Sequence, residues 1–368
     1  MGLSKNRTRS VTIADVAKEA GVAPMTVSRV INGYQHIKPA TALKVREAIE
    51  RLSYSPNPAA RMLMGQRSNS IGLVIPDLKN PFFAVVADAV QMAAREKGYL
   101  VWMVASNTDV QVERREIEKL LSYQVDGILL IPSDPEHPYL KGLLEGEIPL
   151  ISIDLPIKSG IADAVLAENR QCSQQAVEHL ISHGHKSILC LGAWPNLFTM
   201  EERIAGYEAA MKNAGMRPWI ITDAHDFASA KNILHRLWRN KNRPDAIFTL
   251  NQLTTEMLLT LFDEMQIVIP DQVALLAFDD FPLASLFKPK LSVVRQPAAE
   301  LGRRATQLLF EKMEFKEKLP GVRTTLPSEL ILRESCGCKA TSSSGAVSAH
   351  YPRPAEKARK VRGLKSYA

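Results

Sequence analysis

Hydrophobic and polar positions at the start of the chain repeat with the period of an α-helix. Thr12 is a candidate N-cap with Asp15 three residues later, and Gly21 can take the left-handed conformation that ends a helix. The apolar residues between these points, at helical spacing, are Ile13, Val16, Ala17 and Ala20. The pattern predicts a first helix that ends at about Ala20.

A turn and a second helix follow directly. Val22 begins the turn, and Pro24 opens a helix through about Asn32, because the missing N–H of proline costs nothing in a first turn. A third amphipathic helix is expected over residues 40–52. Two short helices joined by a tight turn form a helix-turn-helix, whose second helix can enter the major groove of DNA.

The outer face of the second helix carries side chains that suit DNA. Its buried stripe is supplied by Val27, Val30 and Ile31. The residues expected to contact DNA are Pro24, Met25, Thr26, Ser28 and Arg29. A hydroxyl can bond a phosphate or a base, an arginine can bond guanine, and a methionine can touch a thymine methyl group. The alternative is a helical hairpin with a polar outer face and no nucleic-acid partner.

A fourth, short helix is predicted between two prolines and a glycine. Asn57 is a candidate N-cap, Pro58 suits the first helical position and Gly65 suits the stop. Such a helix is marginal alone, because about 12 residues are needed before an isolated helix competes with coil. We expect it to form against a partner or DNA, where Leu63 could wedge between base steps of a minor groove. The alternative is that Met62, Leu63 and Met64 dock on the next domain.

From residue 71 the pattern changes to short apolar runs that alternate with amphipathic helices. Strands are expected at residues 71–75, 100–104, 127–131, 150–153, 187–191, 246–250 and 273–277. Helices are expected at residues 82–97, 111–123, 168–183, 202–214, 229–239 and 254–264. Such alternation predicts parallel sheets with helices on both faces, and a ligand site beyond the carboxyl ends of the strands.

Composition and charge narrow the class of protein. With 46% hydrophobic residues over 368, the chain can bury the cores of two or three folding units. It has no apolar run of about 18 residues, and residues 1–10 are basic and polar, so we expect a cytoplasmic protein without a membrane span. Residues 1–70 carry a net charge of +7, residues 339–368 one of +6, and the remainder −6. Basic ends indicate a polyanion such as DNA, although residues 339–368 also suit a disordered, solvated tail.

The sequence lacks the motifs of several enzyme classes. It has no dinucleotide-binding glycine motif, phosphate-binding loop, zinc-protease motif or nucleophile elbow, so we expect neither an enzyme nor a cofactor. Asp279 and Asp280 are adjacent and would point to opposite faces of a strand, which argues against a paired acid–base site.

The cysteines and histidines are not expected to bind a metal. The four cysteines, which we interpret as reduced thiols without a function, are Cys172, Cys190, Cys336 and Cys338. The last two lack a second ligand pair at zinc-finger spacing. Three histidines lie close together in the sequence: His179, His183 and His185. No carboxylate or cysteine is spaced with them as a further metal ligand, so we interpret this segment as the end of a helix.

A series of short motifs runs through the chain. Those of the head are VTIADVA at 11–17, AGV at 20–22, TVSRVING at 26–33 and YSPN at 54–57. Those that follow are IGLVIPD at 71–77, NPFF at 80–83, VDGI at 125–128, FDD at 278–280 and VRQP at 294–297. In this order they resemble the LacI (lactose-repressor) family of bacterial transcription regulators. The resemblance covers residues 11 to about 335 and is most specific in the head.

The resemblance implies how the head would bind DNA. In the family, a dimer places two recognition helices in successive major grooves, and paired hinge helices enter the minor groove between them. The residues implied to face bases are Pro24, Met25 and Arg29. Those implied to face phosphates are Thr12, Thr26, Ser28, Asn32 and His36, and those of the hinge contact are Asn57, Ala60 and Leu63. Ala23 and Lys38 depart from the family, which often has a capping serine at each position.

The resemblance also implies the architecture. An all-α helix-turn-helix head would precede an α/β effector domain of two lobes built on parallel sheets, like the type I periplasmic sugar-binding proteins. The expected parts are a head at 1–53, a hinge helix and linker at 54–70, a first lobe of 71–167 with 291–320, a second lobe of 168–288 with 322–335, and a disordered basic tail at 339–368. The chain would cross between lobes near residues 165–168, 286–291 and 319–324.

The effector is expected between the lobes. The apolar wall that the resemblance implies is Phe82 and Phe83, and the polar contacts are Asp154, Thr199, Arg203, Asn251 and Asp279. Carboxylates, amides and a guanidinium fit the hydroxyls of a sugar or sugar acid. Each of these residues also suits a structural role in capping a strand end or packing the lobes. Glu168 and Gln252 replace residues that are common in the family, so the hydrogen bonds around them are open.

These features together predict a transcriptional repressor. We expect a homodimer that binds near-palindromic double-stranded operator DNA, regulates a carbohydrate-catabolism operon and responds to a small effector in a direction that is open. One alternative is a cytoplasmic sugar-binding or sugar-processing protein with an unused head, and another is a dehydrogenase on a doubly wound fold. The recognition residues disfavour the first alternative, and the missing dinucleotide motif disfavours the second.

Overall fold

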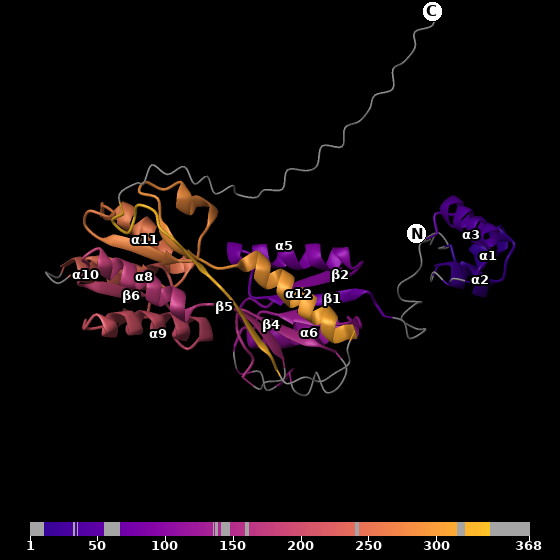
Figure 1. Cartoon of the computed structure of the whole chain (residues 1–368), viewed down its shortest axis with the longest axis horizontal. Coiled ribbons are helices and arrows are strands. Elements are labelled where there is room, and N and C mark those ends of the chain that lie inside the picture. The colour runs from indigo at the N-terminus through magenta and orange to yellow at the C-terminus, as the bar shows by residue number, and fades with distance from the viewer. Residues whose placement is uncertain are drawn as a thin grey trace, which may run out of the picture.

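The computed structural model describes most of the chain (Figure 1). The described residues are 11–31, 34, 36–54, 67–134, 136, 139–140, 148–158, 162–239, 243–314 and 321–338. The predicted hinge helix at 57–64, with Asn57, Ala60 and Leu63, and the predicted basic tail at 339–368 lie outside them. Within the described part of the chain, no helix combines the length and the apolar composition needed to cross a bilayer.

Three helices form the head, as the sequence predicts. They are α1 (Ile13–Ala20), α2 (Pro24–Ile31) and α3 (Pro39–Arg51). The small core that holds them together consists of Val16, Ala17, Val27, Val45 and Ala48. Thr12 and Asp15 form a reciprocal capping box before α1, and Gly21 ends that helix in the left-handed conformation. Lys38 makes no side-chain bond to the start of α3, which is the consequence expected of a missing serine cap.

Two six-stranded sheets form the larger domain. The first has the order β11-β5-β4-β3-β1-β2, and its strands are β1 (Ser70–Ile75), β2 (Leu100–Ala105), β3 (Ile128–Leu130), β4 (Leu150–Ile153), β5 (Asp163–Ala167) and β11 (Arg323–Leu326). The second has the order β12-β10-β9-β8-β6-β7, and its strands are β6 (Ile188–Leu191), β7 (Trp219–Ile221), β8 (Ala246–Thr249), β9 (Ala274–Phe278), β10 (Ser292–Arg295) and β12 (Glu329–Ile331). All pairings are parallel except that of β10 with β12, so the predicted parallel α/β class is confirmed.

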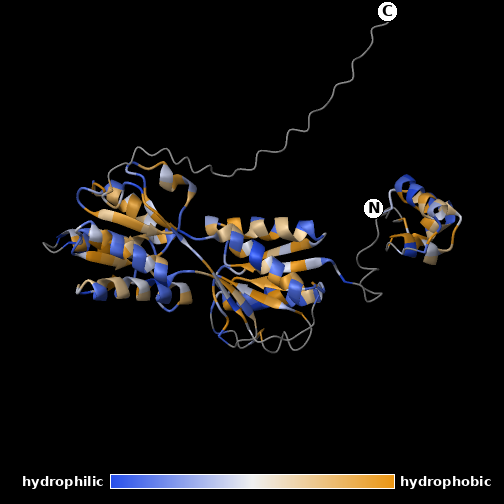
Figure 2. Cartoon of the chain, viewed as in Figure 1, coloured by the Kyte–Doolittle hydropathy of each residue, from blue (hydrophilic) through white to orange (hydrophobic). Residues whose placement is uncertain are grey.

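Helices cover both faces of each sheet. Those of the first lobe are α5 (Pro81–Glu96), α6 (Val110–Ser122) and α12 (Ala298–Glu314). Those of the second lobe are α8 (Arg170–Ser182), α9 (Phe198–Asn213), α10 (Phe227–Arg239) and α11 (Gln252–Glu264), with a short 3-10 helix η1 at Pro282–Ser285. The strands are mostly hydrophobic, whereas the helices carry both kinds of residue (Figure 2). This distribution is typical of sheets buried between amphipathic helices.

The alternation of side chains along β1 shows how one sheet serves two cores. Leu73 and Ile75 point into the cluster formed with α5 and α12, whereas Val74 points into the cluster formed with α6. α5 and α12 lie very close to each other, because a Cβ atom on Gly302 would lie 2.6 Å from the backbone oxygen of Val86. Glycine at this point of α12 therefore allows the two helices to pack this closely.

The structure corrects two of the expected crossings between lobes. β10 pairs with β9 in the second sheet, so residues 291–295 lie with the second lobe and the chain crosses at 296–297, not at 286–291. β11 pairs with β5 in the first sheet, so residues 322–326 lie with the first lobe and the chain crosses at 327–328, not at 319–324. The expectation was wrong because both strands are short and take their place from distant partners. The first crossing lies between β5 and α8, at residues 168–169.

Candidate effector site and DNA-binding head

Three charged side chains converge where strands of the two sheets end. Asp154 follows β4 of the first sheet, Asp279 follows β9 of the second, and Arg203 lies on α9. We call them the strand-end triad; all three are buried. The backbone N–H of each aspartate donates to the next strand, at Val165 (2.9 Å) and Val294 (3.0 Å), before the chain turns away. Both aspartates have positive φ, 69° and 78°, a conformation that aspartate tolerates better than most residues.

Arg203 and Asp279 are held by several hydrogen bonds. Arg203 donates from Nε to Asn169 Oδ1 (2.8 Å) and from Nη1 to the Leu250 carbonyl oxygen (2.6 Å), and its guanidinium lies 3.6 Å above the centre of the Phe278 ring. Its Nη1 is 4.0 Å from Asp279 Oδ2, a weak ion pair rather than a hydrogen bond. The guanidinium is thus fixed in place, which favours specific recognition of a ligand.

Asp279 is held from the other side of the triad. Its Oδ1 accepts from Gln296 Nε2 (2.6 Å), and its Oδ2 accepts from the backbone N–H of Gln252 (3.1 Å). Because Gln296 lies in the crossing between β10 and α12, the carboxylate connects the second sheet to the segment that leads back to the first lobe. Asp279 is therefore in direct contact with one of the crossings between the lobes.

Asp154 is the least satisfied member of the triad. Its Oδ1 is buried and has no hydrogen-bond partner among the described residues. Burial raises the pKa of Asp154 from 3.8 to about 6; Arg203 opposes this shift and Asp279 adds to it. Asp154 belongs to the first lobe and the other two residues to the second, so this interaction acts across the lobes. An unpartnered buried carboxyl oxygen is a ready acceptor for a ligand hydroxyl.

The remaining predicted effector residues have contacts of their own. Asn251 caps α11 by accepting from the Thr254 N–H (2.9 Å), and Thr199 is buried one turn before Arg203 on α9. Phe82 and Phe83 form an edge-on aromatic pair with ring centres 5.4 Å apart at the start of α5. The structure thus brings the three residues of the triad together. Asn251 precedes Gln252, whose backbone N–H donates to Asp279. Phe82 and Phe83 contact each other and the hydrophobic core of the first lobe.

Sequence reasoning missed three residues of this region. Gln296 follows β10 directly and Asn169 lies two residues after β5, so the rule that selected Asp154 and Asp279 could have found them. Gln296 was missed because β10 was not predicted. Phe198, at the start of α9 in the second lobe, packs against the core of the first lobe and has no local signal in the sequence.

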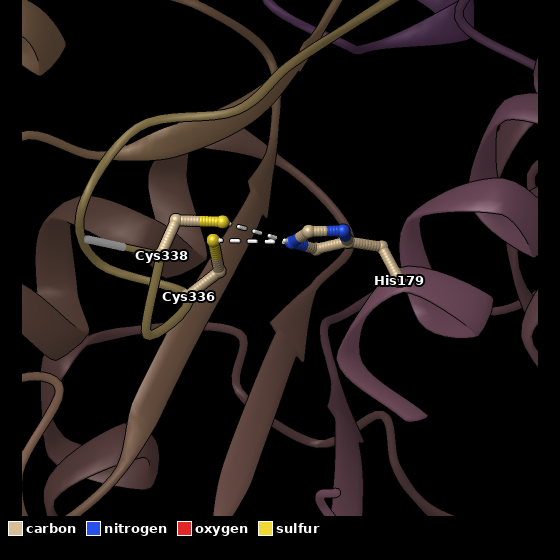
Figure 3. A group of neighbouring side chains, drawn as sticks. All are labelled: His179, Cys336 and Cys338. Atoms are coloured by element: carbon tan, nitrogen blue, oxygen red, sulfur yellow. Dashed lines mark hydrogen bonds between the residues drawn. The ribbon is translucent and has the colours of Figure 1, made fainter. Parts of the chain in front are cut away.

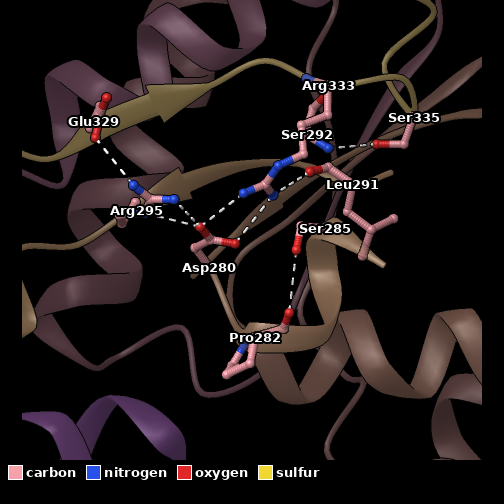
Figure 4. Close-up of polar contacts among 9 residues, drawn as sticks. All are labelled: Asp280, Pro282, Ser285, Leu291, Ser292, Arg295, Glu329, Arg333 and Ser335. Atoms are coloured by element: carbon pink, nitrogen blue, oxygen red, sulfur yellow. Dashed lines mark hydrogen bonds and ion pairs between the residues drawn. The ribbon is translucent and has the colours of Figure 1, made fainter. Parts of the chain in front are cut away.

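Asp280, the residue after Asp279, belongs to a separate ionic network (Figure 4). It accepts from Arg295 Nε (2.9 Å) and Nη2 (2.6 Å), and from Arg333 Nη1 (3.2 Å) and Nη2 (3.0 Å). Arg333 also donates to the Leu291 carbonyl oxygen (2.6 Å). The two neighbouring aspartates therefore have different partners, and the network joins β9 and β10 to the segment after β12.

We predict that Asp280→Asn lowers the free energy of unfolding by about 1 to 2 kcal/mol, because two guanidinium groups lose one shared counter-charge. Arg333 is the more buried partner, with 13% of its side chain exposed. Urea unfolding followed by circular dichroism measures the change. The matched control is Asp271→Asn at an exposed carboxylate, which should change stability by less than about 0.5 kcal/mol. Equal losses in both variants would contradict the prediction.

The head exposes the side chains expected to contact bases. Pro24, Met25 and Arg29 on α2 are exposed, with Met25 exposed by 64%. Before α2, the backbone carbonyl of Ala23 accepts from the N–H of Thr26 (2.8 Å). Alanine has no side-chain oxygen, so this helix begins without the side-chain cap that a serine would provide.

The residues expected to contact phosphates are less uniform. Thr26 and Ser28 are half-buried and His36 is exposed, whereas Asn32 lies outside the described residues. The Thr12 hydroxyl already donates to Asp15 Oδ2 (2.7 Å), so Thr12 has a capping role, and its contact with phosphate stays a prediction. Tyr34, just after α2, is also exposed, by 63%, and the sequence analysis did not name it among the residues of the head's outer surface.

Comparison with known proteins places both parts of the chain. Residues 12–57 match the family model of bacterial regulatory proteins, lacI family, and residues 68–331 match that of periplasmic binding proteins and sugar binding domain of LacI family. The HTH-type transcriptional repressor PurR of Photobacterium profundum is 31% identical over 328 residues, which are 88% of this chain and 98% of that protein.

Two solved structures are similar over nearly the whole chain. The lac repressor dimer bound to operator and the anti-inducer ONPF aligns with a TM-score of 0.80 at 22% identity, over 89% of this chain and 99% of that one. The complex of transcriptional regulator CelR with cellobiose aligns with a TM-score of 0.65 at 27% identity, over 88% and 99%. A head with an exposed second helix, two lobes with charged residues at facing strand ends, and these matches lead to one conclusion: the chain belongs to the LacI family of sequence-specific, DNA-binding transcriptional regulators.

Proposed function

We propose that this regulator is a repressor of a carbohydrate-catabolism operon, and that its effector is a neutral sugar bound at the strand-end triad. The observation that carries the proposal is the buried Oδ1 of Asp154, which has no hydrogen-bond partner among the described residues. Asp154 also interacts electrostatically with Arg203 and Asp279. Two carboxyl groups provide acceptors for neighbouring hydroxyls, and Arg203 provides donors.

The charge of the triad favours a neutral sugar over a sugar acid. Arg203 is the one cation among the three, and its Nε and Nη1 already donate to Asn169 and Leu250. A ligand carboxylate would add a third negative group beside Asp154 and Asp279 in a buried site, where like charges repel strongly. The family model for this domain and the cellobiose complex of the CelR relative also support a sugar.

A thermal-shift screen of the full chain tests the proposed effector class. The panel pairs neutral mono- and disaccharides with their corresponding sugar acids and sugar phosphates at equal concentrations. A ligand at 100 times its dissociation constant adds about 2.7 kcal/mol to the free energy of unfolding and raises the melting temperature. A neutral sugar is expected to give the largest shift. A larger shift from the corresponding acid or phosphate would overturn the proposed class.

We further propose that the protein acts in the cytoplasm as a homodimer on near-palindromic operator DNA, and not as an enzyme. One short recognition helix per chain supports this, because two half-sites supply base contacts that one cannot. The hinge contact of Asn57, Ala60 and Leu63 is part of the same proposal. Operator selection from a random duplex pool, followed by analytical ultracentrifugation of the complex, gives the half-site symmetry and stoichiometry. A single chain bound per operator would contradict the dimer.

We predict that Arg29→Ala weakens operator binding by about 10- to 100-fold, because a guanidinium bonded to a base edge contributes about 1 to 3 kcal/mol of discrimination. Arg29 is the exposed basic residue on α2. Fluorescence anisotropy with labelled operator, at several salt concentrations, measures the loss. The control is Arg236→Ala at an exposed position of α10, which removes the same charge from the effector domain. Unchanged operator affinity in Arg29→Ala would remove this residue from the DNA interface.

A further inference from the structure

A second cluster of polar side chains lies at the other end of the second lobe. It consists of His179 and His183, near the end of α8, and of Cys336 and Cys338, after β12; we call it the His–Cys cluster. α8 begins beside Asn169, which bonds Arg203 of the triad. Because a helix rises about 1.5 Å per residue, the cluster lies about 15 Å along α8 from the triad. It is therefore separate from the effector site.

The distances within the cluster match those between ligands of one metal ion (Figure 3). His179 Nε2 is 3.3 Å from Cys336 Sγ and 3.5 Å from Cys338 Sγ, and His183 Nε2 is 3.5 Å from Cys338 Sγ. Zinc binds nitrogen at about 2.0 to 2.1 Å and sulfur at about 2.3 Å in a tetrahedron, which places nitrogen and sulfur about 3.5 Å apart. The ligand atoms of His179, Cys336 and Cys338 all lie within 4.8 Å of one another.

Hydrogen bonding alone does not account for this arrangement. The Nε2 atom of an imidazole has either one proton or one lone pair, so it makes one good hydrogen bond, yet two sulfur atoms contact Nε2 of His179. Thiols are also weak hydrogen-bonding groups. A metal ion explains why both sulfurs and the imidazole nitrogen face the same point.

The backbone presents the ligands from two firm elements. His179 and His183 are four residues apart on one face of α8, with ring centres 4.5 Å apart. Gly337 has a φ of 93°, which reverses the chain and brings both cysteines to one side. The preceding Ser335 anchors this turn to the second sheet through hydrogen bonds with Leu275 and Ser292.

The surroundings of Cys336 also favour a metal-bound thiolate. The Ser292 hydroxyl donates to Cys336 Sγ (3.0 Å), the kind of outer hydrogen bond that supports a ligand sulfur. A thiolate is the form that binds metal ions.

We propose that the His–Cys cluster is a structural Zn²⁺ site, with His179, Cys336 and Cys338 as three ligands and His183 completing the tetrahedron. Two thiolates and two imidazoles are the ligand set and geometry of closed zinc sites. The ion would fasten the end of the effector domain at Cys338 to α8. This site replaces the sequence-based expectation of thiols without a function and histidines without a metal.

Metal titration of the full-length, reduced protein tests the site. After removal of metals with a chelator, the chain is titrated with Co²⁺ and then with Zn²⁺. We expect the near-ultraviolet band of cobalt–thiolate charge transfer and the visible bands of tetrahedral cobalt, both lost when Zn²⁺ displaces Co²⁺. Elemental analysis should give one zinc ion per chain, and Zn²⁺ should raise the melting temperature.

Matched variants separate this site from adventitious binding. Cys338→Ser, at the less buried cysteine, should lower zinc affinity by about 100-fold or more, and His183→Gln by less. The control is Cys172→Ser, which removes another thiol from α8 and should bind zinc as the unmodified chain does. If Cys338→Ser fails to fold, His179→Gln gives the same comparison. Absence of tetrahedral cobalt bands in folded, reduced protein, or an equal loss in Cys172→Ser, would overturn the proposal.

Discussion

Asp154→Asn should stabilise the ligand-free protein by up to about 3 kcal/mol above pH 6, and should remove most of the dependence of stability on pH between about 4 and 6. Burial raises the pKa of Asp154 from 3.8 to about 6 in the folded chain. Between these values the folded chain binds more protons than the unfolded chain, so the free energy of unfolding falls as pH rises. The penalty is fully present above the folded pKa, and each pKa unit corresponds to about 1.4 kcal/mol.

Urea unfolding at pH 4.5, 5.5, 6.5 and 7.5, with about ±0.2 pH control, measures this effect. Asparagine keeps the shape of the side chain but has no proton to bind, so its curve should lie above that of the unmodified chain at high pH and meet it at low pH. The control is Asp88→Asn, which makes the same change at an exposed position of α5. Parallel curves for Asp154→Asn and the unmodified chain would show that Asp154 is not the titrating group.

Asp279→Ala should lower the affinity for the effector by about 100-fold or more, while operator affinity without effector changes less than about threefold. The change removes a ligand acceptor and leaves the buried Arg203 without its nearby carboxylate. It also leaves Gln252 N–H and Gln296 Nε2 without their acceptor. Unpaired buried groups of this kind cost about 2 to 5 kcal/mol in a binding site.

Calorimetry with the sugar that gives the largest thermal shift measures effector affinity, and anisotropy measures operator affinity. Asp279→Asn retains an acceptor but not the charge, so it should fall between the alanine variant and the unmodified chain. Asp280→Asn serves as a neighbour control, because its carboxylate bonds Arg295 and Arg333 instead. A folded Asp279→Ala protein that binds the sugar normally would show that the effector lies elsewhere.

The head could be predicted nearly to the residue because its signals are local. A capping box spans four residues, and the period of Ile13, Val16 and Ala17 shows directly which face is buried. Strands such as β1 and β4 were found for a similar reason, since each is a mostly apolar run that is buried along its whole length.

The crossings could not be predicted because distant partners decide them. The four residues Ser292–Arg295 contain two valines between polar neighbours, a pattern that suits a connection as well as a strand. Pairing with β9 and β12 makes this segment a strand of the second sheet. Local sequence carries no record of those partners.

The candidate site divides in the same way. The triad follows from one topological rule, that ligands bind beyond the carboxyl ends of parallel strands. The His–Cys cluster follows from no such rule, because its cysteines contact His179 at sequence separations of 157 and 159 positions. Each pair alone, His-x-x-x-His and Cys-Gly-Cys, is too common to indicate a metal site. Only the fold brings the two pairs together.

The interleaved order of strands also has a consequence for synthesis on the ribosome. β11 pairs with β5 but is made roughly 155 residues later, which at about 5 to 20 residues per second is about 8 to 30 s. During that interval β5 is an unpaired edge that can pair with a neighbouring nascent chain. The sheet of the second lobe is likewise incomplete until β10 and β12 have been synthesised. A stop codon before Ser292 would therefore leave both lobes incomplete at once, with the three-helix head as the one finished unit.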